Sequence, residues 1–185
     1  AMIIENMFDL YEKELQEKGH KPTFMPTVIP EENLKKESSH VKGFTPEVFW
    51  LKEISSEKGP RLALRPTSET LYTPMFKLWI RSWRDLPMKL YQRGSVFRLD
   101  TKATRPLIRT REILWIEAHD AFATLKDAEA QVQEDIQMTE RIMHKKFGIP
   151  FLPMKRPNWD KFAGAIYTIG SDVLMPDGKL IQQPS

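Results

Sequence analysis

The sequence predicts an α+β protein in which helices pack against an antiparallel sheet. Three observations predict this class. Apolar residues recur at helical spacing in segments 2–18, 69–83 and 124–148. Two long segments, 89–99 and 107–121, have the composition of strands and are separated by a short polar turn. Near the C-terminus, Pro176-Asp177-Gly178 separates two shorter strand-like segments, which is typical of a hairpin.

The N-terminal third supplies a helix and short strands. The helical spacing over 2–18 is carried by Ile4, Met7, Phe8, Tyr11 and Leu15. Gly19 marks the end of this helix. Residues 23–29 favour a short strand, and Pro30 opens a short helix or turn. Segments 48–54 and 61–65 predict the two strands of a first hairpin.

The remaining elements follow in order. The helix over 69–83 contains Pro74, which must lie in its first turn or kink it. Thr124 and Asp127 predict a capped start for the longest helix, and Gly148 predicts its end. Segments 167–174 and 179–183 are the strands of the C-terminal hairpin.

Composition narrows the class of protein. A chain of 185 residues with 41% hydrophobic residues predicts one domain with a core, here spanning 1–185. The net charge of +3 is compatible with anionic ligands without requiring nucleic acid. The absence of cysteine excludes disulfides, cysteine zinc sites and a cysteine nucleophile. We find no apolar run of about 18 residues and no signal peptide, and therefore expect a cytoplasmic protein without a membrane segment.

Residues 111–119 carry an unusual polar face. In a strand, Ile113, Trp115, Glu117 and His119 lie on one side, with Arg111 beyond them, because side chains alternate. The opposite side carries Glu112, Leu114, Ile116 and Ala118, and the sequence predicts that this second side faces the core. A row of Trp, Glu and His suits a pocket for a polar small molecule. A half-buried face with a satisfied Glu–His pair explains the row equally well.

Two further segments are candidates for ligand binding. One is basic and carries Lys89, Arg93, Arg98, Lys102, Arg105, Arg109 and Arg111, against Asp100. Arginines converging from paired strands would grip a phosphate or carboxylate, whereas a solvated basic edge is the alternative. The other segment, Arg65–Glu69, joins a strand to a helix, where Thr and Ser are ordinary N-cap residues. The four histidines, at 20, 40, 119 and 144, show no metal-ligand spacing, and neither a GxxxxGK[ST] nor a GxGxxG loop occurs.

Short motifs follow one another at consistent spacing over nearly the whole chain. They are Arg65–Thr70, Phe97-Arg98, Arg105–Glu112, Trp115–His119, Lys161–Ala165 and Tyr167-Thr168, supported by His40–Phe44 and Asp85–Pro87. Taken in order, these motifs resemble the catalytic core of the prolyl-tRNA synthetase family, in its archaeal and eukaryotic-like branch.

The resemblance implies a class II synthetase fold, an antiparallel sheet flanked by helices, which agrees with the pattern of predicted elements. It also implies a two-step reaction in which L-proline and ATP form prolyl-adenylate, with Mg²⁺ assisting, and the prolyl group is then transferred to tRNA(Pro). A homodimer is the expected assembly of the full-length family.

The resemblance also implies roles for individual residues. Thr67 and Glu69 match positions that receive the proline ammonium group, and Arg98 matches the catalytic arginine that bridges the carboxylate and the α-phosphate. The proline ring pocket matches Trp115, Glu117, His119 and Phe162. The ATP-binding positions match Arg98, Asp100, Leu107, Arg109, Thr110 and Gln182.

This sequence departs from the family pattern in three respects. Asp100 stands where the family usually has Glu, and Leu107 stands where Phe often stacks on adenine. The chain begins inside the motif 1 helix and stops before motif 3, so we expect an incomplete catalytic domain without the anticodon-binding domain. We therefore expect weak or no activity from the chain alone.

Two other classes of function remain open. One is a non-catalytic synthetase-like module that binds an amino acid or RNA, although retention of Thr67, Glu69, Arg98, Trp115 and His119 disfavours it. The other is a class IIa synthetase for threonine, serine or glycine, which the apolar pocket and the Lys161–Ala165 motif disfavour. The absence of cysteine further disfavours a zinc-dependent threonine site.

Overall fold

The computed structural model describes residues 1–38, 48–52, 59–99, 104–106, 108–162 and 164–183. It divides into two compact units, Ala1–Ala123 and Thr124–Ser185. Antiparallel sheets and helices occur in both units, so the predicted α+β class is confirmed. No helix in the described part of the chain combines the length and apolarity needed to cross a membrane.

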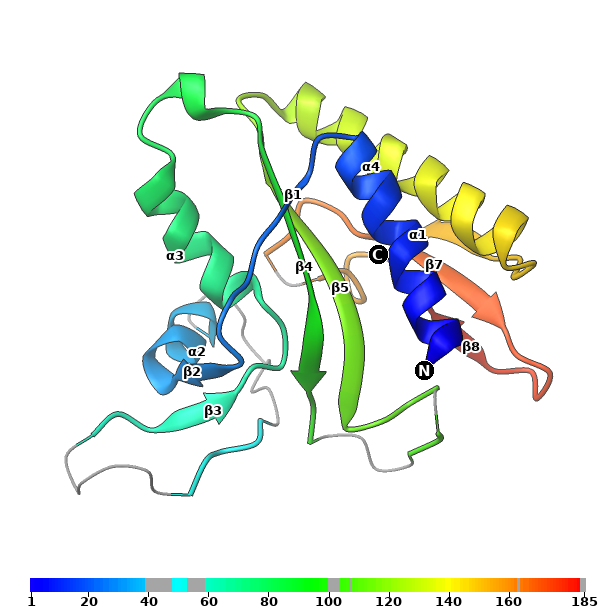
Figure 1. Cartoon of the computed structure of the whole chain (residues 1–185), viewed down its shortest axis with the longest axis horizontal. Coiled ribbons are helices and arrows are strands. Elements are labelled where there is room, and N and C mark those ends of the chain that lie inside the picture. The colour runs from blue at the N-terminus through cyan, green and yellow to red at the C-terminus, as the bar shows by residue number, and fades with distance from the viewer. Residues whose placement is uncertain (39–47, 53–58, 100–103, 107, 163, 184–185) are drawn as a thin grey trace. The chain divides into compact units, whose positions relative to one another are not determined.

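The first unit contains a three-stranded sheet with helices on both faces (Figure 1). Its elements are α1 (Met2–Glu17), β1 (Lys21–Pro22), β2 (Val28–Pro30), α2 (Glu31–Ser38), β3 (Leu62–Leu64), α3 (Glu69–Trp79), the 3-10 turn η1 (Trp83–Asp85), β4 (Met88–Phe97) and β5 (Glu112–Ala121). The sheet order is β1-β4-β5, with β1 parallel and β5 antiparallel to β4. The register places Gln92 opposite Glu117 and Leu90 opposite His119. A polar pair therefore lies in the middle of the two longest strands.

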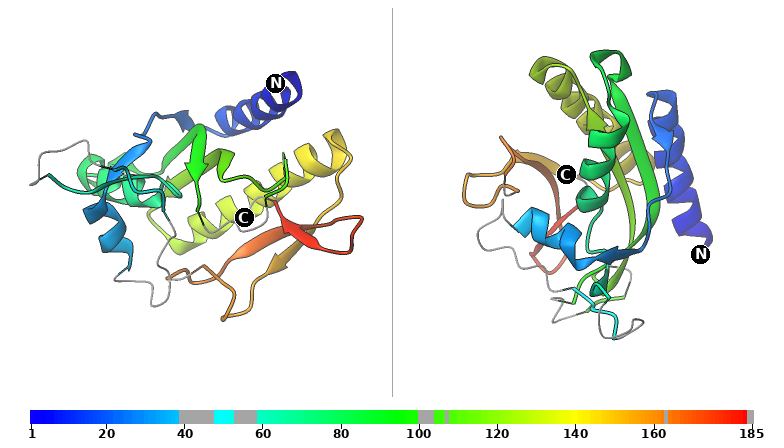
Figure 2. Two further views of the ribbon diagram at one scale, coloured as in Figure 1. Left: turned by 90° about the horizontal axis from the view of Figure 1, so that it is seen from below. Right: turned by 90° about the vertical axis from the view of Figure 1, so that its left-hand side faces the viewer.

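Helix α1 covers one face of this sheet, on the side opposite α3 (Figure 2). Arg93 of β4 forms an ion pair with Glu5, and its guanidinium lies 4.3 Å from the ring centre of Phe8. Gln16 donates a hydrogen bond of 2.6 Å to the Tyr91 hydroxyl. Odd-numbered side chains of β4 therefore face α1, as the period-two alternation of a strand requires.

Helix α3 covers the other face and contains a proline in its second turn. Pro74 has no N–H, so the Thr70 carbonyl lacks its helical donor. Asn33 of α2 donates to this carbonyl at 3.5 Å. The predicted helix over 69–83 ends at Trp79 and is followed by η1, where Asp85 accepts the backbone N–H groups of the preceding turn.

The core of this unit lies between α2, α3 and the strands. It consists of Met25, Ile29, Leu34, Val48, Ala63, Leu71, Tyr72 and Leu90, all buried. Burying each such large side chain contributes about 1.5–3 kcal/mol. Because Leu71 and Tyr72 belong to α3, this packing fixes the start of that helix beside the sheet.

Three strand predictions need adjustment. The expected pairing of 48–54 with 61–65 is seen in two hydrogen bonds: the Leu51 N–H donates to the Leu62 carbonyl, and the Leu64 N–H donates to the Phe49 carbonyl. The second strand is shorter than predicted, since β3 spans Leu62–Leu64, and its partner strand is β2. Residues 53–58 lie outside the described residues. β5 begins at Glu112 rather than 107, because Arg105 and Arg109 exchange backbone hydrogen bonds in a tight turn. The predicted core face of β5 is wrong: Leu114 is 54% exposed, whereas Glu117 on the other side is buried.

The second unit contains a helix and an antiparallel sheet. Its elements are α4 (Leu125–Thr139), the π-helical turn η2 (Glu140–Lys146), β6 (Leu152–Lys155), β7 (Ile169–Leu174) and β8 (Leu180–Gln182). Thr124 caps α4 by accepting the N–H of Asp127 at 3.2 Å, as predicted. The predicted C-terminal hairpin is β7-β8. Strand β6, which pairs with the other edge of β7, was not predicted.

Candidate active site

The Arg65–Glu69 loop is held against the end of β4 by its backbone. The Arg65 carbonyl accepts the N–H of Phe97, and the Arg65 N–H donates to Thr27, each at 2.9 Å. Within the loop, the Thr67 hydroxyl donates a hydrogen bond to the Glu69 carboxylate. Thr67 is buried and Glu69 is half-buried. The structure therefore brings together the two predicted acceptors of an ammonium group.

Glu117 is a buried carboxyl group in contact with two donors of Ser68 and one ring nitrogen of His119. Its Oε2 accepts the Ser68 backbone N–H at 3.2 Å, and its Oε1 accepts the Ser68 hydroxyl at 3.3 Å. The His119 Nε2 lies 2.9 Å from Oε2. Only 8% of the Glu117 side chain is exposed, so these bonds are what compensates its burial. Glu117 therefore links β5 to the Arg65–Glu69 loop.

His119 is also fixed from its ring face. Its ring stacks on Tyr72, with centroids 4.0 Å apart and planes inclined by 18°. The Tyr72 hydroxyl bonds to Thr23, which in turn donates to the Tyr91 carbonyl at 2.9 Å. Burial raises the pKa of Tyr72, so the phenol stays protonated. Helix α3 thus partly covers the side of β5 that carries Trp115, Glu117 and His119. The Trp115 Nε1 is buried without a hydrogen-bond partner among the described residues.

Arg98 follows the last residue of β4. Its Nε donates to the Pro66 carbonyl at 3.1 Å, and its guanidinium lies 5.2 Å from the ring centre of Trp115. A cation at that distance from an indole face is attracted to it. Arg98 therefore lies beside the Thr67–Glu69 pair and over the aromatic member of the β5 row.

Arg65 and Gln92 are site residues that the sequence reasoning did not single out. Arg65 is 4% exposed and donates to the Ser95, Met25 and Gln92 oxygens at 2.9, 2.8 and 3.2 Å. Burial lowers its pKa, and the nearby Glu117 opposes that shift. A lone Gln within the apolar part of a strand was the available signal, since such a side chain needs buried partners.

Glycine is required where Arg65 passes under β4. A Cβ at Gly94 would lie 2.3 Å from the Arg65 Nη2. Any larger residue at position 94 would therefore displace the guanidinium from its hydrogen bonds.

The basic segment does not form a single cradle. Lys89 and Arg93 face α1, where Lys89 donates to the Lys18 carbonyl at 2.8 Å and Arg93 pairs with Glu5. Arg98 lies on the opposite side, because its number has the other parity along the strand. Of the two alternatives, a cradle formed by all these cations is therefore not what the described residues form.

Several predicted ATP residues are only partly placed. Arg109 is exposed in the turn before β5, and the Thr110 hydroxyl donates to the Glu112 carbonyl. Asp100, Lys102 and Leu107 lie outside the described residues, as do the 40–44 segment and Ala163. Of the residues predicted to bind ATP, the structure therefore describes Arg98, Arg109, Thr110 and Gln182.

Phe162 and Gln182 belong to the second unit. Phe162 is 49% exposed, and its N–H donates to the Thr168 hydroxyl at 2.9 Å. Gln182 accepts from Arg156 at 3.2 Å, and Arg156 also forms a two-pronged pair with Asp172 at 2.7 and 2.5 Å. This pairing raises the pKa of Arg156. Arg156 therefore holds the Gln182 side chain by its amide oxygen.

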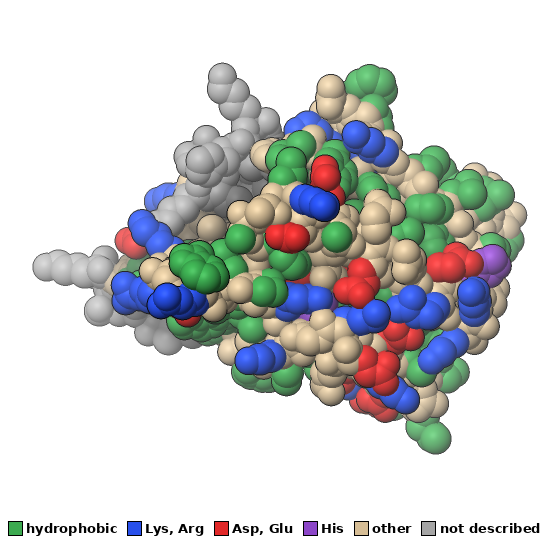
Figure 3. All heavy atoms as spheres, turned by 90° about the horizontal axis from the view of Figure 1, so that it is seen from above, with side chains coloured by type: hydrophobic (Ala, Val, Ile, Leu, Met, Phe, Trp, Pro, Cys, Tyr) green, Lys and Arg blue, Asp and Glu red, His purple; other side chains and the backbone are tan. Residues whose placement is uncertain are grey.

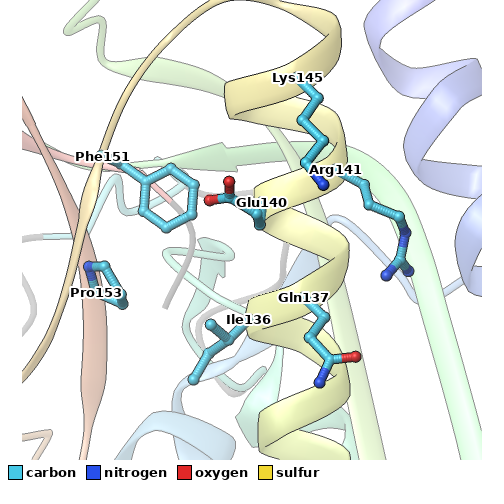
Figure 4. Close-up of a pocket in the computed structure, with 7 residues that line it drawn as sticks. All are labelled: Ile136, Gln137, Glu140, Arg141, Lys145, Phe151 and Pro153. Carbon is cyan, nitrogen blue, oxygen red and sulfur yellow. The ribbon is translucent and has the colours of Figure 1, made fainter.

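A hollow of about 350 Å³ lies in the second unit (Figure 4). Ile136 and Glu140 face Phe151 and Pro153 across it, and none of the predicted site residues lines it.

In the part of the chain that the structure describes, no group of three or more His, Asp or Glu residues could hold a metal ion. One molecular face intersperses basic with acidic side chains, in keeping with the small net charge (Figure 3).

The arrangement of the Thr67–Glu69 pair, Arg98 and the polar side of β5 agrees with the family comparison. Residues 49–184 match the family of tRNA synthetase class II core domains (G, H, P, S and T), and the chain belongs to this family. Within the class, the similarity narrows to prolyl-tRNA synthetases.

The proline–tRNA ligase of Thermofilum pendens is 55% identical over 97% of this chain, and that of Pyrococcus horikoshii is 47% identical over 97%. The chain spans 37% and 38% of these two relatives. A solved Giardia lamblia prolyl-tRNA synthetase in complex with prolyl-adenylate superposes with a TM-score of 0.90, at 45% identity, over 96% of this chain and 36% of its own. The resemblance drawn from the motifs is confirmed.

Proposed function

We propose that this chain forms the proline- and ATP-binding part of a proline–tRNA ligase. The chain spans less than two thirds of the length of its relatives, and the activity of a whole proline–tRNA ligase is therefore part of what we propose. The observation that carries it is the position of Arg98, which bonds to the Pro66 carbonyl at 3.1 Å, next to the Thr67–Glu69 pair. One cation thus lies beside the loop that carries the two proposed ammonium acceptors and 5.2 Å from the ring centre of Trp115.

The chemistry follows from the donors and acceptors present. A proline zwitterion carries two N–H donors, which need acceptors such as Thr67 and Glu69. Its carboxylate oxygen attacks the α-phosphorus of ATP, a new C–O–P linkage forms, and the bond to the pyrophosphate group breaks. Because the carboxylate is already ionised, no side chain has to remove a proton in this step.

Arg98 contributes electrostatic stabilisation. Its guanidinium is permanently charged and can hold the carboxylate and the α-phosphate together while negative charge builds up. Holding the two reactants in line also removes much of the entropic cost of their encounter. The row of Trp115, Glu117 and His119 would line the proline ring pocket, and Phe162 is a further proposed contact of the ring.

ATP enters such sites with Mg²⁺ bound chiefly by its own phosphates. The described residues offer no ligand cluster for an additional ion, so no step is assigned to one. Arg109, Thr110 and Gln182, with Asp100 and Leu107, complete the proposed ATP contacts.

Transfer to tRNA(Pro), pairing with a second copy and a cytoplasmic location belong to the same proposal. Exposed apolar side chains at Met2, Ile3 and Phe24, which are 80%, 77% and 94% exposed, support a partner subunit at α1 and the segment after it. Sedimentation of wild type and Phe24→Asp tests this: the variant should be monomeric where the wild type is dimeric. A monomeric wild type would remove the dimer from the proposal.

The decisive experiment measures binding of a non-hydrolysable prolyl-adenylate analogue by calorimetry, with alanyl and threonyl analogues for comparison. Proline-dependent ATP–pyrophosphate exchange is measured on the same samples. We expect the prolyl analogue to bind most tightly. Equal binding of all three analogues would overturn the proposal.

The control is a second arginine in a similar setting. Arg84 lies 5.4 Å from the ring centre of Trp83, close to the 5.2 Å of Arg98 over Trp115. Arg98→Ala should weaken analogue binding, and in a full-length relative the same change should slow exchange by about 10²–10³. Arg84→Ala should leave both unchanged. Similar losses in the two variants would remove the special role of Arg98.

A further inference from the structure

A chain of four buried polar residues leads from Arg65 to His119 and determines where each proton lies. Arg65, Gln92 and Ser68 are 4%, 4% and 0% exposed, and Glu117 is 9% exposed. None of these side chains can exchange its partner for water. The direction of each hydrogen bond is therefore set by which groups can only donate.

The chain starts at two donors that cannot accept. The Gln92 Oε1 receives the Met25 backbone N–H at 3.1 Å and the Arg65 Nη1 at 3.2 Å. This fixes the amide orientation and turns the Gln92 NH₂ toward Ser68, to whose hydroxyl it donates. Since the Ser68 oxygen accepts there, its own proton points elsewhere.

The proton of Ser68 points to Glu117. The hydroxyl lies 3.3 Å from Oε1, and the Ser68 backbone N–H lies 3.2 Å from Oε2. Both carboxyl oxygens of Glu117 therefore already receive a donor from Ser68. Glu117 is then an acceptor only, and the His119 Nε2, 2.9 Å away, has to donate to it.

We propose that Ser68 and Gln92 are positioning residues that keep Glu117 an acceptor and thereby hold a proton of His119 on Nε2, directed at the Glu117 carboxyl group. Tyr72 keeps the ring in this orientation by stacking on it at 4.0 Å. In terms of the proposed function, on which this part rests, the proline pocket then contains an imidazole whose orientation is set by the chain.

The test is the ¹⁵N spectrum of the histidine side chains in the ¹⁵N-histidine-labelled chain, at mildly alkaline pH where free histidine is neutral. The His119 signals are assigned from their loss in His119→Gln. We expect a protonated Nε2. An Nε2 that carries no proton would overturn the proposal.

Variants test the chain link by link. In Glu117→Gln, the neutral amide no longer requires a donor, so both tautomers of His119 should appear. Ser68→Ala and Gln92→Leu should each weaken the preference for Nε2–H, whereas Ser68→Thr keeps the hydroxyl and should restore it. A tautomer unchanged in all of these variants would show that His119 does not depend on the chain.

The matched control is a buried glutamine elsewhere. Gln131 is 8% exposed and donates to Asp135 at 2.8 Å within α4. Gln131→Leu should leave the His119 spectrum and the prolyl-adenylate analogue affinity unchanged, whereas Gln92→Leu should lower that affinity about tenfold without changing the affinity for ATP. Equal effects of the two glutamine variants would overturn the positioning role. Failure of the wild type to bind the analogue would count against the proposed function alone, because the tautomer is read without a ligand.

Discussion

Replacing Gly94 by alanine tests how tightly the Arg65 guanidinium is held. The added Cβ would lie 2.3 Å from Nη2 and 3.6 Å from Cζ of Arg65. To relieve this contact, the Arg65 Nη2 would have to move away by about 1 Å, and a flexible arginine at the surface would do so at little cost. Here the guanidinium is pinned, since Nε donates to Ser95 at 2.9 Å and Nη1 donates to Met25 at 2.8 Å.

The expected magnitude follows from these bonds. A net hydrogen bond from a charged donor contributes about 1.5–3 kcal/mol, and overpacking a core costs about 1–3 kcal/mol. Gly94→Ala should therefore lower the free energy of unfolding by about 3 kcal/mol, although alanine is ordinarily the better residue within a strand. A loss of stability would therefore reverse the ordinary preference for alanine over glycine within a strand.

Urea denaturation followed by tryptophan fluorescence measures the effect. Of the five tryptophans, Trp159 lies in the second unit and is 89% exposed, so a Trp159→Phe background confines the signal to the first unit. In an Arg65→Met background the shorter side chain removes the clash, and Gly94→Ala should then be neutral or slightly stabilising. An equal cost of Gly94→Ala in both backgrounds would refute the contact with Arg65 as its cause.

Three other predictions concern separate parts of the molecule. Glu69→Ala should weaken proline binding much more than ATP binding in calorimetry, because it removes an ammonium acceptor; equal losses would contradict its assignment. Asp85 accepts two backbone N–H groups at 2.8 Å, which hold its pKa below the ordinary value, so its stabilising effect is present above that value and lost as the pH falls. The difference in melting temperature between wild type and Asp85→Asn should thus be constant above about pH 5 and shrink below about pH 4; a difference that persists in acid would exclude this origin. Thr124→Ala should cost about 1 kcal/mol through loss of the α4 cap, whereas Thr73→Ala on the exposed side of α3 should change stability by less than about 0.5 kcal/mol, both measured by thermal unfolding.

The sequence allowed the helices, the long strand pair and the loop at Arg65–Glu69 to be predicted, because each has a local pattern. Period-two alternation and a capping residue at Thr124 are properties of a few neighbouring residues. The same alternation could not tell which side of β5 is covered. Leu114 faces outward and Glu117 is buried because Ser68, far away in sequence, supplies two donors to the carboxylate.

The buried chain of Arg65, Gln92 and Ser68 could not be predicted for a related reason. Arg65 carries a charge, and charge in a sequence is usually a sign of exposure. Its burial depends on three oxygens supplied by residues 25, 92 and 95 and on the missing side chain at Gly94. Only the antiparallel register of β4 and β5 brings Gln92 opposite Glu117 and so completes the network.

The basic segment, in contrast, could have been divided from the sequence. Lys89 and Arg93 have odd numbers and Arg98 has an even one, and in a regular strand that parity places them on opposite faces. The first two accordingly meet α1, where Arg93 pairs with Glu5, while Arg98 meets Pro66 and Trp115. Counting like charges along a strand without regard to parity overstates the anion-binding potential of the segment. Among the described residues of β4 and its end, this segment contributes one arginine, Arg98, to the proposed site. The Pro66 carbonyl and the Trp115 indole ring hold it there.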